Sequence, residues 1–95
     1  MAANAVAFQA ALNRIGFPQA AVNSIVANGI TSTNDLLGLS DKDTAQILKI
    51  IRAGNPPIVV PYIAQKRLNI FCFWANRRNR LNEPIDPARF NQMSP

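Results

Sequence analysis

The fold is decided by residues 61–81, PYIAQKRLNIFCFWANRRNRL, the longest stretch of this chain without an internal proline or glycine. Pro61 suits the first position of a helix, because the N–H that proline lacks has no partner at a helix start. The spacing of apolar residues predicts a helix that continues to about Leu81. One stripe of small and apolar side chains is expected to face the core. This stripe consists of Ala64, Leu68, Phe71 and Ala75, with Cys72 beside it.

The other side chains of this helix divide into a second apolar stripe and a basic arc. The second stripe holds Ile63, Ile70, Trp74 and Leu81, and the arc holds Lys66, Asn69, Asn76, Arg77 and Arg80, with Phe73 among them. A helix that is apolar on two sides is either covered by its neighbours or bound by a partner. The candidate protein-interface residues are Ile63, Ile70, Phe73 and Trp74.

The basic residues of the same helix have two interpretations. There are five of them, Arg67 included, and residues 61–81 contain no acid. The candidate nucleic-acid-binding residues are Lys66, Arg77, Arg78 and Arg80. In the first interpretation they contact nucleic-acid phosphates and Phe73 stacks on a base. In the second they form the solvated face of a basic protein. Trp74 is expected to anchor a core or an interface rather than to stack on a base.

Glycine and proline divide the rest of the chain into shorter predicted helices. Residues 5–15 form the first, which ends at Gly16, and residues 18–28 form the second. A short third helix is expected around 34–37, with Ser32 and Asp35 at the spacing of a capping box. Ser40 caps a fourth, whose predicted buried residues are Ala45, Ile47, Leu48 and Ile51. Residues 56–60 are an extended connector to the long helix.

Length and composition indicate one small all-α domain. The chain has 95 residues and a net charge of +5. Residues 1–81 are predicted to form a compact bundle of five helices, and residues 82–95, with three prolines, a C-terminal tail. The charge is uneven: residues 1–60 carry four basic and three acidic side chains, whereas residues 61–95 carry six basic and two acidic ones.

Several classes of chemistry are excluded by what the chain lacks. It has no histidine and a single cysteine, so Cys/His metal sites, histidine bases and internal disulfides are ruled out. Three of its five acids stand at predicted helix starts, and Glu83 and Asp86 lie in the proline-rich tail. We therefore expect no enzyme activity, no catalytic residues, no cofactor and no metal.

The expected compartment is the cell interior, either cytoplasm or nucleus. The first residues have neither the basic start nor the apolar run of a signal peptide. The longest apolar run, IFCFWA at 70–75, is far shorter than a membrane span. Cys72 lies in this run and is expected to be a small buried hydrophobe. No membrane partner is expected.

Four short motifs resemble a sterile-alpha-motif-like (SAM-like) five-helix domain. They are Leu12 to Phe17 (LNRIGF), Asn28 to Ser32 (NGITS), Asp35 to Asp43 (DLLGLSDKD) and Ile47 to Gly54, followed by a long last helix. The resemblance covers residues 5–81. The chain departs from the family where Gly54 to Pro61 replaces the glycine turn that usually precedes the last helix.

The same pattern is similar to the N-terminal helical region of copia-type retroelement polyproteins of algae. The positions of four arginines match the pattern of that region: Arg52, Arg77, Arg78 and Arg80. This resemblance implies a gag-like or adaptor role and carries no catalytic residue across. Two functions follow as predictions. The first is a non-enzymatic module that binds another protein or itself, and the alternative is a nucleic-acid-binding domain that uses the basic last helix.

Overall fold

The computed structural model describes residues 2–54, 56–87 and 90. Over these residues all regular secondary structure is helical, as the sequence predicts. The elements are α1 (Ala2–Arg14), α2 (Gln19–Ala27), the 3₁₀ turn η1 (Thr33–Leu36), α3 (Asp41–Arg52) and α4 (Tyr62–Arg80).

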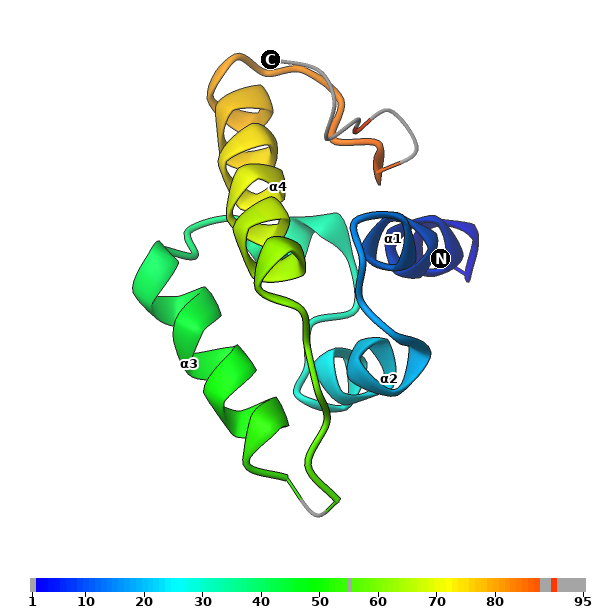
Figure 1. Ribbon diagram of the computed structural model, residues 1–95. Coiled ribbons are helices and arrows are strands. Elements are labelled where there is room, and N and C mark those ends of the chain that lie inside the picture. The colour runs from blue at the N-terminus through cyan, green and yellow to red at the C-terminus, as the bar shows by residue number, and fades with distance from the viewer. Residues whose placement is uncertain (1, 55, 88–89, 91–95) are drawn as a thin grey trace.

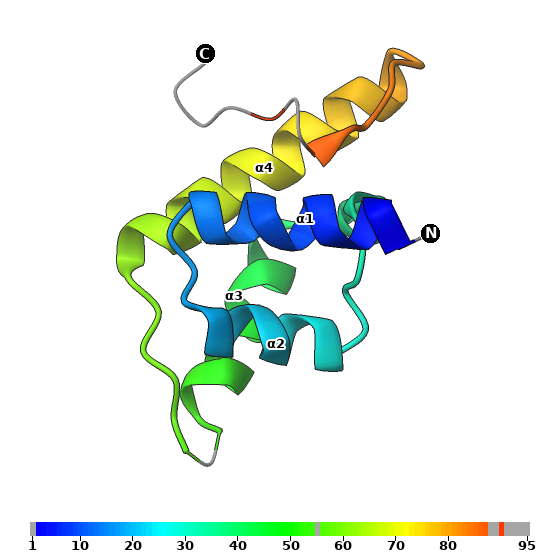
Figure 2. The same cartoon turned by 90° about the vertical axis from the view of Figure 1, so that its right-hand side faces the viewer.

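The helices surround one core, which α4 crosses (Figure 1). Helices α1 and α2 form an antiparallel pair, visible in Figure 2, and α3 lies on the opposite side of α4 from α1. The turn between α1 and α2 approaches α4 closely at Gly16. A Cβ atom at Gly16 would lie 3.4 Å from the Cβ of Ala64, and its φ of +116° favours glycine.

The prediction of five helices is wrong by one, because the third is a single 3₁₀ turn. The predicted capping box is confirmed: the Asp35 carboxylate accepts from the N–H of Ser32 at 3.2 Å. Only four residues separate the cap from Leu37, and Gly38 then turns the chain at a φ of +84°. That is too short for an α-helical nucleus to gain from propagation. Leu36 nevertheless reaches the core from this turn.

The predicted core stripe of α4 is confirmed. Its side chains Ala64, Leu68, Phe71, Cys72 and Ala75 are all buried. Burial raises the pKa of the Cys72 thiol to about 12, with the charge of Asp41 adding to the effect. The thiol therefore stays protonated at neutral pH and packs as a small apolar group.

The buried face of α3 differs from its prediction at one position. Leu48 and Ile51 are buried and Ile47 packs against the core, as predicted, but Ala45 is exposed. Thr44 is buried in its place. Its hydroxyl lies 2.6 Å from the side-chain oxygen of Asn69, so the buried polar group is satisfied by α4.

The proline-rich segment after α4 returns to the core. Phe90 is buried, and its ring centroid lies 4.5 Å from that of Phe71. The Arg14 guanidinium donates to the carbonyl oxygens of Pro87 and Phe90, at 3.1 and 3.3 Å. Residues 88, 89 and 91–95 of the predicted tail lie outside the described residues.

Candidate interaction surface

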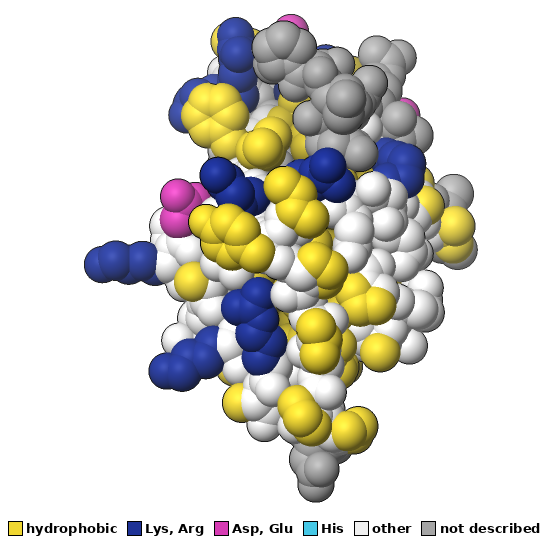
Figure 3. All heavy atoms as spheres, viewed as in Figure 1, with side chains coloured by type: hydrophobic (Ala, Val, Ile, Leu, Met, Phe, Trp, Pro, Cys, Tyr) yellow, Lys and Arg dark blue, Asp and Glu magenta, His cyan; other side chains and the backbone are white. Residues whose placement is uncertain are grey.

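The side of α4 opposite its core stripe exposes apolar and basic side chains together. Phe73 is 63% exposed, Ile63 50% and Ile70 46%. Lys66, Arg77 and Arg80 are exposed beside them. Figure 3 shows hydrophobic and basic side chains interleaved over α4 on this side of the molecule. We call the following set the outer face of α4: Tyr62, Ile63, Lys66, Ile70, Phe73, Arg77 and Arg80.

Two predicted site residues do not belong to the outer face. Trp74 is half-buried, with its ring centroid 5.9 Å from that of Phe71 and 5.4 Å from that of Phe90. The guanidinium of Arg78 lies 5.2 Å from the centre of the Trp74 ring, within the range of a cation–π contact. Both side chains therefore hold the returning tail against α4.

Two asparagines of the predicted basic arc face other elements of the fold. The Asn76 amide donates to the carbonyl oxygen of Leu36 at 3.3 Å, and its oxygen accepts from the N–H of Gly38 at 2.8 Å. Asn69 faces Thr44 of α3. The helical wheel places both on the polar side correctly, but it does not show which neighbours cover that side.

Tyr62 belongs to the outer face but was not among the predicted site residues. Its side chain is 70% exposed, and the Lys66 amino group lies 6.0 Å from the centre of its ring. The two residues are four apart, so they are neighbours on the helix surface. The spacing of four between Tyr62 and Lys66 is the feature of the sequence that could have indicated Tyr62 as a site residue. With Tyr62, the outer face has one exposed aromatic side chain at its N-terminal end and another, Phe73, just past its middle.

The outer face lies in a long acid-free stretch of the sequence, which is bounded by Asp43 and by Glu83, three residues after Arg80. Residues 44–82 contain seven basic residues and no Asp or Glu. The nearest preceding acid, Asp43, is occupied as the cap of α3, where it accepts from the N–H of Ser40 at 2.9 Å. Hydrogen bonds from Ser40, its backbone N–H above all, lower the pKa of the Asp43 carboxyl. Asp35 has the same role at η1, where the backbone N–H of Thr31 contributes most to a lowered pKa.

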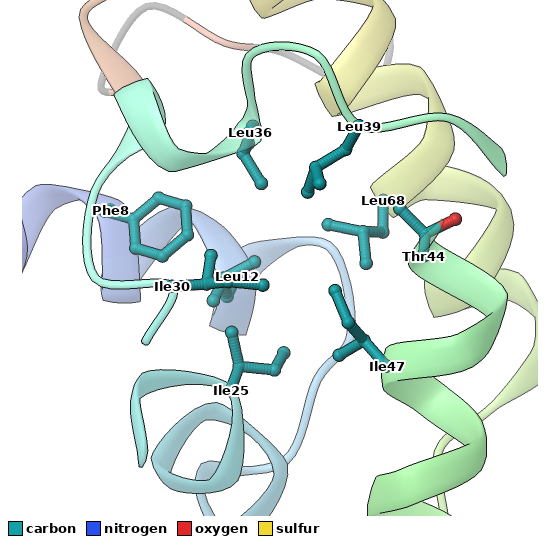
Figure 4. A pocket seen from close by; sticks show the side chains of 9 residues that line it. All are labelled: Phe8, Leu12, Ile25, Ile30, Leu36, Leu39, Thr44, Ile47 and Leu68. Atoms are coloured by element: carbon teal, nitrogen blue, oxygen red, sulfur yellow. The ribbon is translucent and has the colours of Figure 1, made fainter. Parts of the chain in front are cut away.

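The core formed by the described residues contains a cavity that is too small for a ligand. One small cavity lies between α1, α2, η1, α3 and α4, and Figure 4 shows the side chains that line it. They include Phe8, Ile25, Leu39 and Leu68. Its free space is about 10 Å³, about what a single water molecule needs. We interpret this cavity as a packing gap.

Within residues 2–54, 56–87 and 90, no three His, Cys, Asp or Glu side chains group in a way that could hold a metal ion. Over those same ranges, no helix has both the length and the hydropathy of a membrane span.

No protein-family model, curated protein or solved structure matches this chain. The outer face of α4 is therefore the feature of this chain that bears most directly on function.

Proposed function

We propose that this protein is a non-enzymatic helical module that binds another protein through the outer face of α4. The observation that carries the proposal is the exposure of Ile63, Ile70 and Phe73 by about half or more on one helix face. Side chains of this size gain free energy when a partner removes them from water. Clusters of exposed apolar residues with polar neighbours are typical of interaction sites.

The composition of the outer face also favours a protein partner. Aromatic residues and arginine supply most of the energetically dominant contacts in protein interfaces. Here Phe73 lies one helical turn from Arg77, and Tyr62 one turn from Lys66. The aliphatic side chains of Ile63 and Ile70 gain little from a nucleic acid but fit a protein surface. This is the adaptor role that the gag-like resemblance implies, and the SAM-like resemblance itself remains a prediction.

Selection of binders from a random peptide display library tests the proposal. The bait is the intact protein, and the test variant is Ile70→Ser with Phe73→Ser. Val6→Ser is the matched control, because Val6 is an exposed apolar residue of α1 away from this face. We expect the selected peptides to bind the wild type and the control but not the double variant. Enrichment of no peptide, or of peptides that bind all three proteins equally, would overturn the proposal.

Nucleic-acid binding is the second candidate, favoured by one specific observation. Tyr62 and Phe73 expose their rings on the same face as Lys66, Arg77 and Arg80, an arrangement suited to stacked bases with phosphates alongside. Arg78 is already engaged with Trp74, so three basic residues of this face remain for phosphates.

A single-stranded oligonucleotide separates the two candidates. If three phosphates are neutralised, a plot of the logarithm of the binding constant against the logarithm of the salt concentration should have a slope of about −2. Fluorescence anisotropy between roughly 50 and 200 mM salt measures this slope. Absence of binding at the lower salt concentration rejects the nucleic-acid candidate.

A further inference from the structure

The outer face of α4 contains a regular seam. Six of its residues follow one another at alternating spacings of three and four, which is the heptad spacing of helices that pack side by side. The seam extends over roughly 25 Å at 1.5 Å per residue. Its residues are Ile63, Lys66, Ile70, Phe73, Arg77 and Arg80.

The order of side chains along the seam is asymmetric. Ile63, Ile70 and Phe73 make its first two thirds mainly apolar, whereas Arg77 and Arg80 make its last third basic. The whole seam lies opposite the buried stripe of α4, so its side chains face away from the core. From the N-terminal to the C-terminal end of α4, a partner helix along this seam would therefore contact apolar side chains and then positive charge.

Charge argues against a second copy of this chain as the occupant. In an antiparallel pair centred between Ile70 and Phe73, Lys66 of each copy lies opposite Arg77 of the other. In a parallel pair each basic residue lies opposite itself. Like charges placed opposite each other at a helix interface destabilise the pair. The seam itself, residues 63–80, contains no Asp or Glu that could compensate them.

We propose that the outer face of α4 binds an acidic amphipathic helix of another protein, packed antiparallel along the heptad seam. This inference rests on the proposed function and specifies its partner. An antiparallel partner begins beside Arg77 and Arg80 and continues along Phe73 and Ile70. Asp or Glu in its first turns pairs with the two arginines and also complements the positive end of its own helix dipole. Apolar residues at heptad spacing follow.

Synthetic helical peptides of about three heptads test this inference. The first peptide carries Glu in its first turns and a leucine seam in the rest. The second has the same residues in reverse order, and the third replaces each Glu by Lys. Isothermal titration calorimetry against the intact protein measures their affinities. We expect the first peptide to bind at least about tenfold more tightly than either of the others.

A charge exchange on the protein locates the contact. Arg77→Glu with Arg80→Glu should weaken the first peptide at least about tenfold and allow the Lys peptide to bind. Lys42→Glu with Lys49→Glu is the matched control, because it changes the net charge equally on the exposed side of α3. The control should leave the first peptide's affinity unchanged. An equal loss in both double variants would show a net-charge effect and overturn the inference.

The remaining outcomes separate this inference from the proposed function. Library peptides that require Ile70 and Phe73 but bear no acids would leave the proposed function standing and overturn the acidic helix. Equal affinity for the first and the reversed peptide would overturn the antiparallel arrangement. A dimer of the wild type in sedimentation equilibrium that Phe73→Ser dissociates would identify a second copy as the occupant. If none of the synthetic peptides binds and the library selection also yields no peptide specific for the outer face, both proposals are rejected.

Discussion

Asn76 connects two parts of the fold through one side chain. Its amide contacts the carbonyl oxygens of Leu36 and Cys72 and the N–H of Gly38. Asn76→Ala leaves these backbone groups without their partner, so the free energy of unfolding should fall by about 1–3 kcal/mol. Urea denaturation measures the change. Asn79→Ala, at an exposed position of the same helix, is the control and should be nearly neutral. Equal stability of the two variants would contradict the role of Asn76.

Thr33 shows the opposite situation, a buried hydroxyl without a hydrogen-bond partner among the described residues. Thr33→Val removes a desolvated polar group and keeps the shape, so we expect a gain in the free energy of unfolding of about 1 kcal/mol. Thr44→Val is the matched comparison. It should be destabilising, because the Thr44 hydroxyl is bonded to Asn69. Thermal unfolding of both variants checks the prediction, which fails if Thr33→Val lowers the melting temperature.

At the scale of an element, the two capping boxes make the free energy of unfolding depend on pH in the acid range. Hydrogen bonds lower the pKa values of Asp35 and Asp43 in the folded chain below their ordinary value of 3.8. As pH falls, the unfolded chain takes up these protons first. The contribution of both caps is therefore complete above pH 3.8 and is lost as the pH falls through the lower folded values.

Asp43→Asn tests this dependence. We expect stability, measured by urea denaturation between roughly pH 2 and 5, to decline less steeply in the variant than in the wild type, because one proton-linked cap is missing. Glu83→Gln, at an exposed position just after α4, is a control outside both caps. An unchanged acid slope in Asp43→Asn would contradict the prediction.

Element type and boundaries could be predicted where local chemistry determines them. Ser40 with Asp43 starts α3, and Gly16 follows α1, because caps and turns depend on residues close in sequence. Helical spacing likewise predicted the buried stripe of α4. The short third helix was mispredicted because a cap determines where a turn begins but not whether an α-helix follows.

The candidate site was less predictable because it depends on distant neighbours. A helical wheel places Trp74 and Ile70 on the same stripe. Only the tertiary structure shows that Phe90 covers the first and leaves the second exposed. In the same way, Asn76 meets its partners about forty residues away in sequence. Such contacts leave no periodic signal in the chain.

At the scale of the whole molecule, Phe90 closes the core from a distant part of the chain. It stacks on Phe71 at 4.5 Å and meets the edge of Trp74 at 5.4 Å. Phe90→Ala should lower the free energy of unfolding by about 3–5 kcal/mol, as expected for a buried aromatic residue. Chemical denaturation followed by Trp74 fluorescence measures it. Leu81→Ala, at an exposed site, is the control, and equal losses in the two variants would refute the prediction.

The return of the tail to α1 and α4 also has a consequence for synthesis on the ribosome. A nascent chain that has emerged only to residue 80 contains α1, α2, η1, α3 and α4, yet the aromatic surface of Phe71 and Trp74 still lacks its cover. Because contacts between distant residues form late, the last step of folding waits for residue 90 to leave the exit tunnel. A chain shortened to residues 1–86 should therefore bind the dye ANS, which detects loosely packed apolar surface, more strongly than the full chain.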